Sequence, residues 1–270
     1  MKELLSFEFR KLWRSKSFWI CSIVMVVLKI AGIVITAASQ NMLKSLYGDQ
    51  ANMISDADLA LFNSSGIKEL VSASSGSNMT ILFAIFVTLF ICTDFTEGTI
   101  KNILSRGFSR QQVYAAKSIT IIAGGLLFSL LSMLIGFTGG SIAFGVGNGF
   151  NGTLIVTLLI QLLALIAYIM MNVLLAVLFT KAGGAMTLGI IIPMVVPLLG
   201  QLGDLAIASI VEGASLNDKF ISKFLIGTNL SSISNLGVPG GDLALAAAVF
   251  AAYAILFTFL GFLSIRKKEV

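Results

Sequence analysis

Six long apolar runs alternate with polar segments along the chain. About 20 residues in a helix, rising about 1.5 Å each, cross a hydrocarbon core of roughly 30 Å. The runs predict membrane spans at residues 18–38, 79–93, 118–144, 153–180, 182–202 and 243–265. They lack the apolar and polar alternation of membrane barrel strands. The sequence therefore predicts an all-α integral membrane protein, with one transmembrane domain over residues 1–270.

The polar segments at residues 39–78 and 203–242 are the longest between spans. The first includes ISDADLALFNSSGIKELV, which predicts one or two surface helices. It also includes SASSGSN. Because the second span is short, we expect its helix to begin within this stretch. In the other segment, the spacing of Phe220, Phe224 and Leu225 predicts a helix at the membrane interface. A locally packed loop is the alternative for this stretch.

The first 16 residues, MKELLSFEFRKLWRSK, combine apolar residues at helical spacing with basic flanks. This pattern predicts an interfacial helix over residues 1–16, lying parallel to the membrane before the first span. A cleavable signal peptide is the alternative. The apolar run that follows is longer than a signal core, and no small-residue cleavage pattern follows it closely. We therefore expect the segment to be retained.

Composition supports the membrane assignment and narrows the chemistry. Hydrophobic residues make up 57% of the chain and charged residues 11%, and the mean hydropathy is +0.96, which excludes an ordinary soluble domain. The chain has no histidine, so the usual general base and the commonest metal ligand are missing. Cys21 and Cys92 fall in or beside apolar spans and are expected to pack there. We expect no catalytic residue and no metal site.

The basic residues are distributed unevenly between the two sides that six spans define. With the N-terminus inside, thirteen of the eighteen lysines and arginines fall inside, four fall outside, and Lys29 lies within the first span. This asymmetry follows the positive-inside rule and predicts that both termini are cytoplasmic. The net charge of +5 is therefore a topology signal, and no nucleic-acid partner is expected.

A compact charged segment, DFTEGTIKNILSRGFSRQQVYAAK, separates the second and third spans. Asp94 or Thr96 is expected to cap a helix that begins near Glu97, and Gly107 is expected to end it. Ser109 and Gln112 then form an S-x-x-Q capping box that begins the helix of the third span. The segment thus predicts two helices in an L. The alternative is a solvated loop whose charges only fix topology.

The same segment resembles the region after the second span in six-helix permeases of the type-two ABC exporters. The matching positions are Glu97, Gly98, Thr99, Lys101, Leu104, Ser105, Gly107, Ser109, Arg110 and Lys117. In that family a coupling helix here docks on a separate ATPase, and two permeases form the pathway. The resemblance implies a coupling-helix loop at residues 97–113, with coupling residues Glu97, Gly98, Thr99, Lys101, Ile103, Leu104, Arg106 and Arg110.

The resemblance also implies the partners. No G-x-x-x-x-G-K-[ST] motif occurs, so ATP and Mg are expected on a partner, an ABC ATPase in two copies. The other expected partners are a second copy of the permease or a paralogue, and the lipid bilayer. The chain is similar to the small six-helix permeases of antimicrobial-peptide immunity and resistance systems. The implied function is therefore export of an amphipathic or hydrophobic compound, such as an antimicrobial peptide, across the cytoplasmic membrane of a prokaryote. A non-transporting sensor or scaffold that docks an ATPase is the alternative, whereas a membrane enzyme lacks the required residues.

Several polar residues lie inside the predicted spans. Lys29 is expected near mid-bilayer, where a charge costs roughly 2.5–3.5 kcal/mol. It either lines the pathway or pairs with an acid such as Asp204; the alternatives are snorkelling and a purely structural pair. Gln161 and Asn172 are pathway candidates too, or they hydrogen-bond between helices. Pro193 and Pro197 are expected to kink or break the fifth span.

Overall fold

The computed structural model describes residues 1–47, 64–75, 77–147, 150–211, 219–234 and 237–267, and these contain helices but no strand. Its helices are α1 (Lys2–Arg14), α2 (Lys16–Tyr47), α4 (Gly66–Ser75), α5 (Ser77–Thr96), α6 (Thr99–Ser105), α7 (Arg110–Phe144), α8 (Gly152–Phe179), α9 (Ala182–Ala208), the 3-10 turn η2 (Ser222–Phe224), α10 (Ile226–Ser232) and α11 (Gly240–Lys267).

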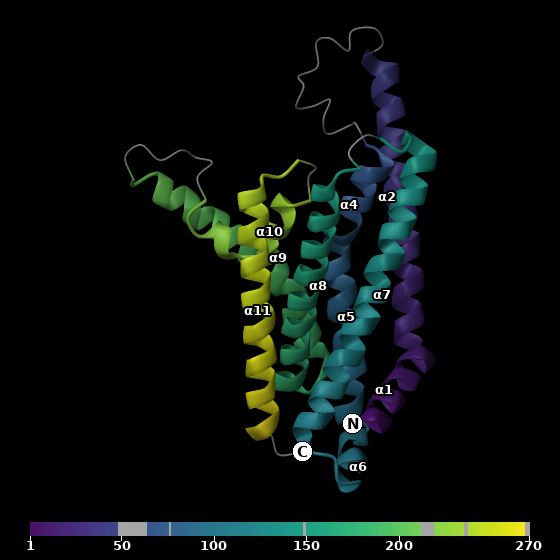
Figure 1. Cartoon of the computed structure of the whole chain (residues 1–270), viewed down its shortest axis with the longest axis vertical. Helices are drawn as coiled ribbons and strands as arrows, with labels where there is room; N and C mark the ends of the chain where they lie inside the picture. Colours follow the sequence, from purple (N-terminus) through teal and green to yellow (C-terminus); the bar gives the residue numbers. More distant parts are fainter. Residues whose placement is uncertain (48–63, 76, 148–149, 212–218, 235–236, 268–270) are drawn as a thin grey trace.

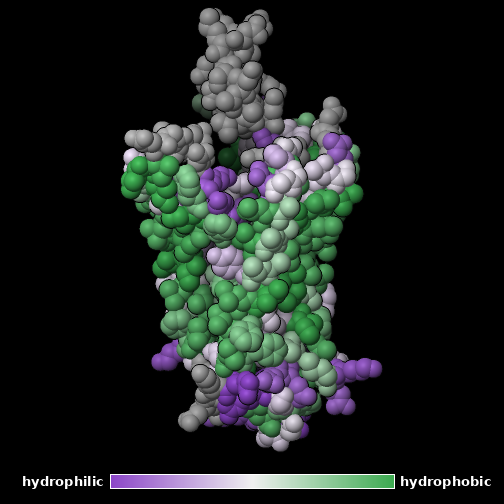
Figure 2. Space-filling view, turned by 60° about the vertical axis from the view of Figure 1, so that its left-hand side comes forward, coloured by the Kyte–Doolittle hydropathy of each residue, from purple (hydrophilic) through white to green (hydrophobic). Residues whose placement is uncertain are grey.

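Six of these helices, α2, α5, α7, α8, α9 and α11, are long and apolar enough to cross a membrane. Figure 1 shows them side by side along the long axis, with α6 and both termini at one end. On the face shown in Figure 2, hydrophobic side chains form a band across the middle, and hydrophilic side chains gather toward both ends. The chain is therefore an all-α integral membrane protein, as predicted.

The central membrane helix is α8, which contacts α5, α7, α9 and α11. It has no charged residue, and most of its side chains are buried. The outer helices α2, α9 and α11 instead expose many large apolar side chains. Apolar exposure on this scale fits a lipid surface rather than water. The protein core therefore lies around α8, and the outer helices supply the hydrophobic band.

The short helix α4 packs into the α7 surface at the end opposite α6. A Cβ on Gly136 would come 2.7 Å from the Glu69 carbonyl oxygen, and one on Gly140 would come 2.9 Å from the Glu69 side chain. Glycine at these positions lets the two helices approach closely. Ser132 also donates a hydrogen bond to the Ala73 carbonyl over 3.0 Å. Residues Gly66–Ser75 thus form a helix against the bundle, whereas residues 48–63, part of the expected surface helices, lie outside the described residues.

Several helices run past the ends of the spans predicted for them. The second span extends beyond residue 93 to Thr96 as part of α5, and α9 continues to Ala208. The prediction was that Pro193 and Pro197 kink or break the fifth span; they do not break it, because α9 runs through both. Figure 1 shows its last part turning away from the bundle.

The segment after α9 does not form the predicted helix through Phe220, Phe224 and Leu225. The Asp204 carboxylate accepts hydrogen bonds from the backbone N–H groups of Phe220, at 2.9 Å, and Ser222, at 3.3 Å. These bonds hold a tight turn that leads into η2, and α10 begins only at Ile226. Asp204 is therefore committed to this turn, and the conceived pairing with Lys29 was wrong.

Candidate functional site

The charged segment between the second and third spans forms the short helix α6, seated on α1 and α7. Ile103 is only 7% exposed and packs in one apolar cluster with Leu4 of α1 and with Val113 and Ala116 of α7. Ile100 is also buried. Burying such side chains contributes about 1.5–3 kcal/mol each. The helix is therefore held against two others and is not a solvated loop.

Glycines make the turns at both ends of α6. Gly98 has φ +68° and Gly107 has φ +88°, a left-handed region that other L-residues adopt at a cost of roughly 1–2 kcal/mol. Ser109 and Gln112 then form the predicted capping box: the Gln112 N–H donates to Ser109 Oγ, and the Ser109 N–H donates to Gln112 Oε1 over 3.0 Å. The L of two helices and the end at Gly107 are confirmed.

The predicted N-terminal caps of this helix were wrong. The Thr96 hydroxyl donates back to carbonyls within α5, so it still belongs to that helix. Glu97 is exposed in the turn, and α6 begins at Thr99 with Gly98 before it. Asp94 is buried and accepts bonds from two lysines instead. Asp94 does not cap α6, because its carboxylate is bound by lysines of α1 and α7.

A largely buried cluster of four charges joins α1, α5 and α7. Lys117 Nζ donates to Glu8 Oε1 over 2.8 Å and also to Asp94 Oδ2. Lys11 donates to the other oxygen of Asp94. Two acids and two bases make the cluster neutral. Because Glu8, Asp94 and Lys117 are almost fully buried, loss of one partner would leave an uncompensated charge in an apolar setting.

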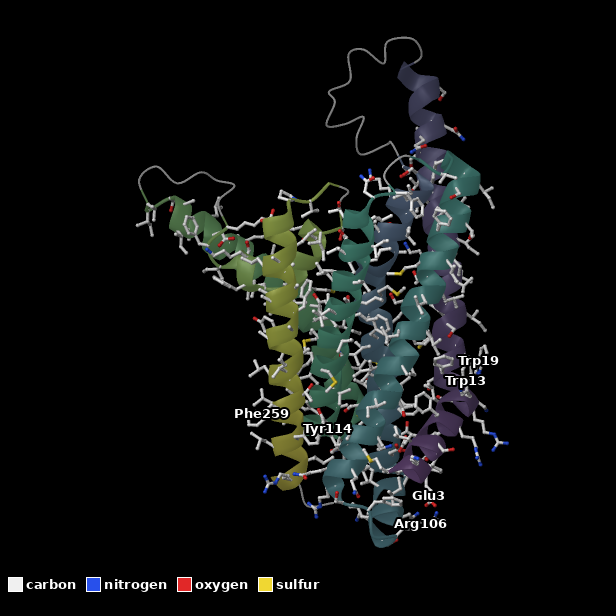
Figure 3. The ribbon with its side chains drawn as sticks, in the orientation of Figure 1. Glu3, Trp13, Trp19, Arg106, Tyr114 and Phe259 are labelled. Atoms are coloured by element: carbon white, nitrogen blue, oxygen red, sulfur yellow. The ribbon has the colours of Figure 1, made fainter. Side chains whose placement is uncertain are left out.

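The helix α1 is held by this cluster and by Leu12, not by a membrane surface alone. Leu12 is fully buried and packs over Gly124 of α7, where an added Cβ would come 3.3 Å from its side chain. Figure 1 shows α1 inclined along the bundle, so the prediction of a helix parallel to the membrane plane needs correction. The exposed Trp13 and Trp19 lie at its junction with α2 (Figure 3).

A groove of about 450 Å³ runs between α1 and α6 at the end of the molecule. Its lining includes Glu3 and Arg106, both labelled at this end in Figure 3. It also includes the apolar side chains Leu4, Phe7 and Phe108. Apolar side chains beside charges of opposite sign form a surface on which a protein partner can dock.

The sequence comparison agrees with this architecture. Residues 4–200 match the family described as ABC-2 family transporter protein. The chain belongs to this family. It is thus the permease component of a membrane transport system, not itself catalytic, and membership implies association with an ABC ATPase. No curated protein matches the chain.

In this ABC-2 permease, the predicted coupling residues divide between the surface and the seat of α6. Lys101 and Arg106 are exposed, as is Glu97, and Gly98 and Thr99 form the half-buried start of the helix. Arg110 opens α7 and is half-buried. Ile103 is buried and Leu104 half-buried, and both pack inside the chain. These two side chains therefore hold α6 in place and do not form its outward surface.

The predicted pathway residues of the permease lie in two different environments. Gln161 is fully buried and donates to the Ile233 carbonyl over 3.4 Å. Asn172 is buried too and donates to Tyr168 within its own helix. Both side chains are buried and hydrogen-bonded within the chain, and their role in a pathway stays a prediction. Lys29 is half-buried and borders a cavity.

The role of Glu8 was not predicted; Lys11 was counted only as a topology charge, and Lys117 as a topology charge and a position of the family resemblance. One signal was available for Glu8. Leu4, Glu8 and Leu12 recur every four residues and so lie on one face of the helix. An acidic residue on that apolar face needs a buried cation.

Proposed function

We propose that the chain is the permease subunit of an ATP-driven exporter, and that α6 is the helix through which a separate ATPase acts on the spans. The observation that carries this proposal is the position of α6. It projects at the end of α5 and α7, presents Lys101 and Arg106 outward, and rests on α1 through the buried Ile103. A partner that moves α6 therefore moves three other helices with it.

The charged cluster supports transmission of this motion into the membrane. Asp94 lies on α5 and Lys117 on α7, on the two sides of α6, and Glu8 and Lys11 tie both to α1. Ion pairs in an apolar setting are stiff, because separating them exposes charges with nothing to solvate them. The adjoining ends of α1, α5, α6 and α7 would then move together. The long helices α5 and α7 would carry this motion to the pathway.

The assembly that follows has the α6 end in the cytoplasm of a prokaryote, with both termini on that side. The thirteen-to-four distribution of basic residues favours this orientation. Two ATPase subunits would hold ATP and Mg, one below each of two permeases, which are identical copies or paralogues. The exposed apolar faces of α9 and α11 are the available surfaces for lipid and for pairing.

The transported compound is proposed to be amphipathic or hydrophobic, with antimicrobial peptides as the first candidates. The substrate class rests on the resemblance to small peptide-resistance permeases. The chain's largely apolar surface supports entry of the compound from the membrane.

The decisive experiment reconstitutes the permease with its ATPase in vesicles and follows ATP-dependent movement of a labelled amphipathic peptide. Lys101→Glu with Arg106→Glu should abolish ATPase co-purification and movement. Arg266→Glu is the matched control, because Arg266 is also exposed and lies in the last turn of α11, which ends at the same end of the molecule as α6. Substrate-stimulated ATP hydrolysis without any movement would instead identify a sensor. Unchanged co-purification of the α6 variant would refute coupling through this surface.

A further inference from the structure

A cavity lies within the membrane region of the bundle, between α2, α4 and the start of α5. Its volume is about 160 Å³, and most of its lining is apolar, including Met25, Ile33 and Leu82. Two charged side chains of opposite sign, Lys29 of α2 and Glu69 of α4, also line it. Lys29 is the fourteenth of the 27 residues in the candidate span Lys16–Met42. The cavity therefore brings a cation from the middle of an apolar span together with an anion from α4.

The two charges share the cavity without neutralising each other directly. They attract each other across it, but they are absent from the ion pairs with N to O distances of 4.0 Å or less that the described residues form. Glu69 Oε2 accepts one weak bond from the Ser72 hydroxyl, at 3.4 Å. Unlike the Glu8, Lys11, Asp94 and Lys117 cluster, this pair keeps space between its members. In an apolar setting, separated charges attract matching charges strongly.

The cavity is accessible from the side of α2. Leu28, which lines it, is 41% exposed, and Gly32, which also lines it, is exposed. A Cβ added to Gly32 would meet nothing within 4 Å. The space beside this glycine is therefore open. A volume of this size holds a small polar head group or several waters.

We infer that this cavity binds the head group of a zwitterionic amphiphile. An ammonium of the ligand meets the Glu69 carboxylate, and its carboxylate or phosphate meets the Lys29 ammonium. An apolar tail lies along Met25, Ile33 and Leu82. A single charge would leave one of the two side chains unmatched, so the cavity selects molecules that carry both. The inference rests on the proposed transport function, because it assigns the occupant as the transported compound.

Binding to the purified full-length permease, without any ATPase, tests the cavity itself. The probe is N-palmitoyl-lysine, which carries a carboxylate, an ammonium and an apolar tail. Native mass spectrometry in detergent gives its affinity and those of palmitate and hexadecylamine. The wild type should bind N-palmitoyl-lysine at least tenfold more tightly than either singly charged amphiphile. Equal affinities for the three would overturn the inference.

Charge-removing variants give a readout that a purely structural role would not move. Lys29→Met should shift preference to hexadecylamine, and Glu69→Gln should shift it to palmitate. Gly32→Leu keeps both charges, fills the open side and should weaken binding of all three. Lys219→Met and Asp242→Asn remove exposed charges outside the cavity and should leave binding unchanged. Folded variants that keep wild-type preference would overturn the inference, and Gly32→Leu decides the matter if a charge variant fails to fold.

Two further arms separate the cavity from the transport proposal. Lysophosphatidylethanolamine carries an ammonium and a phosphate, and preference for it over N-palmitoyl-lysine would assign the cavity to a membrane lipid and overturn the substrate assignment. ATP-driven movement of N-palmitoyl-lysine in vesicles tests transport. Selective binding without movement would refute the transport role and keep the binding site. Movement that survives Gly32→Leu and both charge variants would refute the site and keep the transport role.

Discussion

Lys117 Nζ lies 2.8 Å from Glu8 Oε1, and this buried contact joins two helices whose residues are 109 positions apart in the sequence. Lys117 also binds Asp94, which in turn binds Lys11. These contacts tie α1 to α5 and α7, the two helices that flank α6 in the sequence.

Replacing Lys117 with Met should destabilise the permease strongly. Glu8 would lose its cation and Asp94 would keep only Lys11, and a buried charge left without its partner costs about 3–5 kcal/mol. Thermal unfolding of the purified protein in detergent measures the effect. Lys101→Met, which removes an exposed lysine of α6, should unfold like the wild type. Equal unfolding temperatures for the two variants would show that the cluster contributes nothing.

Alanine at either end of α6 should weaken its turns. Gly98 and Gly107 have positive φ and open space around the missing Cβ, so Gly98→Ala and Gly107→Ala should each cost about 1–2 kcal/mol through backbone conformation alone. Gly183→Ala is the matched control, because Gly183 lies inside α9 with equal space and gains about 0.5–1 kcal/mol of helix stability. The measurement is protease resistance of the α6 region. Variants that all resist equally would refute the argument.

Glu97→Ala should leave the permease folded and reduce its action on the ATPase. Glu97 is exposed in the turn between α5 and α6, where a carboxylate can meet a cation of another chain. Loss of such a charge-assisted bond, worth about 1.5–3 kcal/mol, would lower the ATPase association constant roughly 10- to 100-fold. Titrated co-purification checks this value. Asp242→Ala removes an exposed acid at the opposite end and should have no effect; an equal effect of both would remove Glu97 from the interface.

Cysteine labelling tests the proposed orientation. Cys21 and Cys92 are buried and would be replaced by Ala. Arg106→Cys and Arg266→Cys should then react only with a reagent that enters the cell, whereas Val146→Cys should react with an impermeant one. All three positions are exposed. Impermeant labelling at position 106 with protection at 146 would invert the topology.

The spans were predictable because a bilayer imposes long apolar runs on any sequence. The capping box at Ser109 and Gln112 was predictable because both partners lie within four residues. The end of α5 was not, because Asp94 remains inside a helix only where Lys11 and Lys117 neutralise it. That contact is set by packing between distant segments. For the same reason the sequence placed Ile103 on a docking face, although Leu4 of α1 covers it.

The cavity at Lys29 could likewise be predicted only in part from the sequence. The position of Lys29 in an apolar run indicated a special environment. Its counterpart Glu69 lies in a helix that approaches α2 only because glycines of α7 allow α4 to settle closely. Such an arrangement depends on three helices at once, and no local pattern encodes it.

The distance in sequence between Glu8 and Lys117 also sets an order of events during synthesis. Glu8 and Lys11 leave the ribosome with the first helix, before either partner exists. Asp94 follows at the end of the second span, and Lys117 completes the set only as the third span emerges. Until then α1 has no buried seat and rests at the membrane surface with its acid solvated. The third span is thus the earliest point at which the chain can lock its N-terminal helix, and truncation before Lys117 should leave that helix undocked.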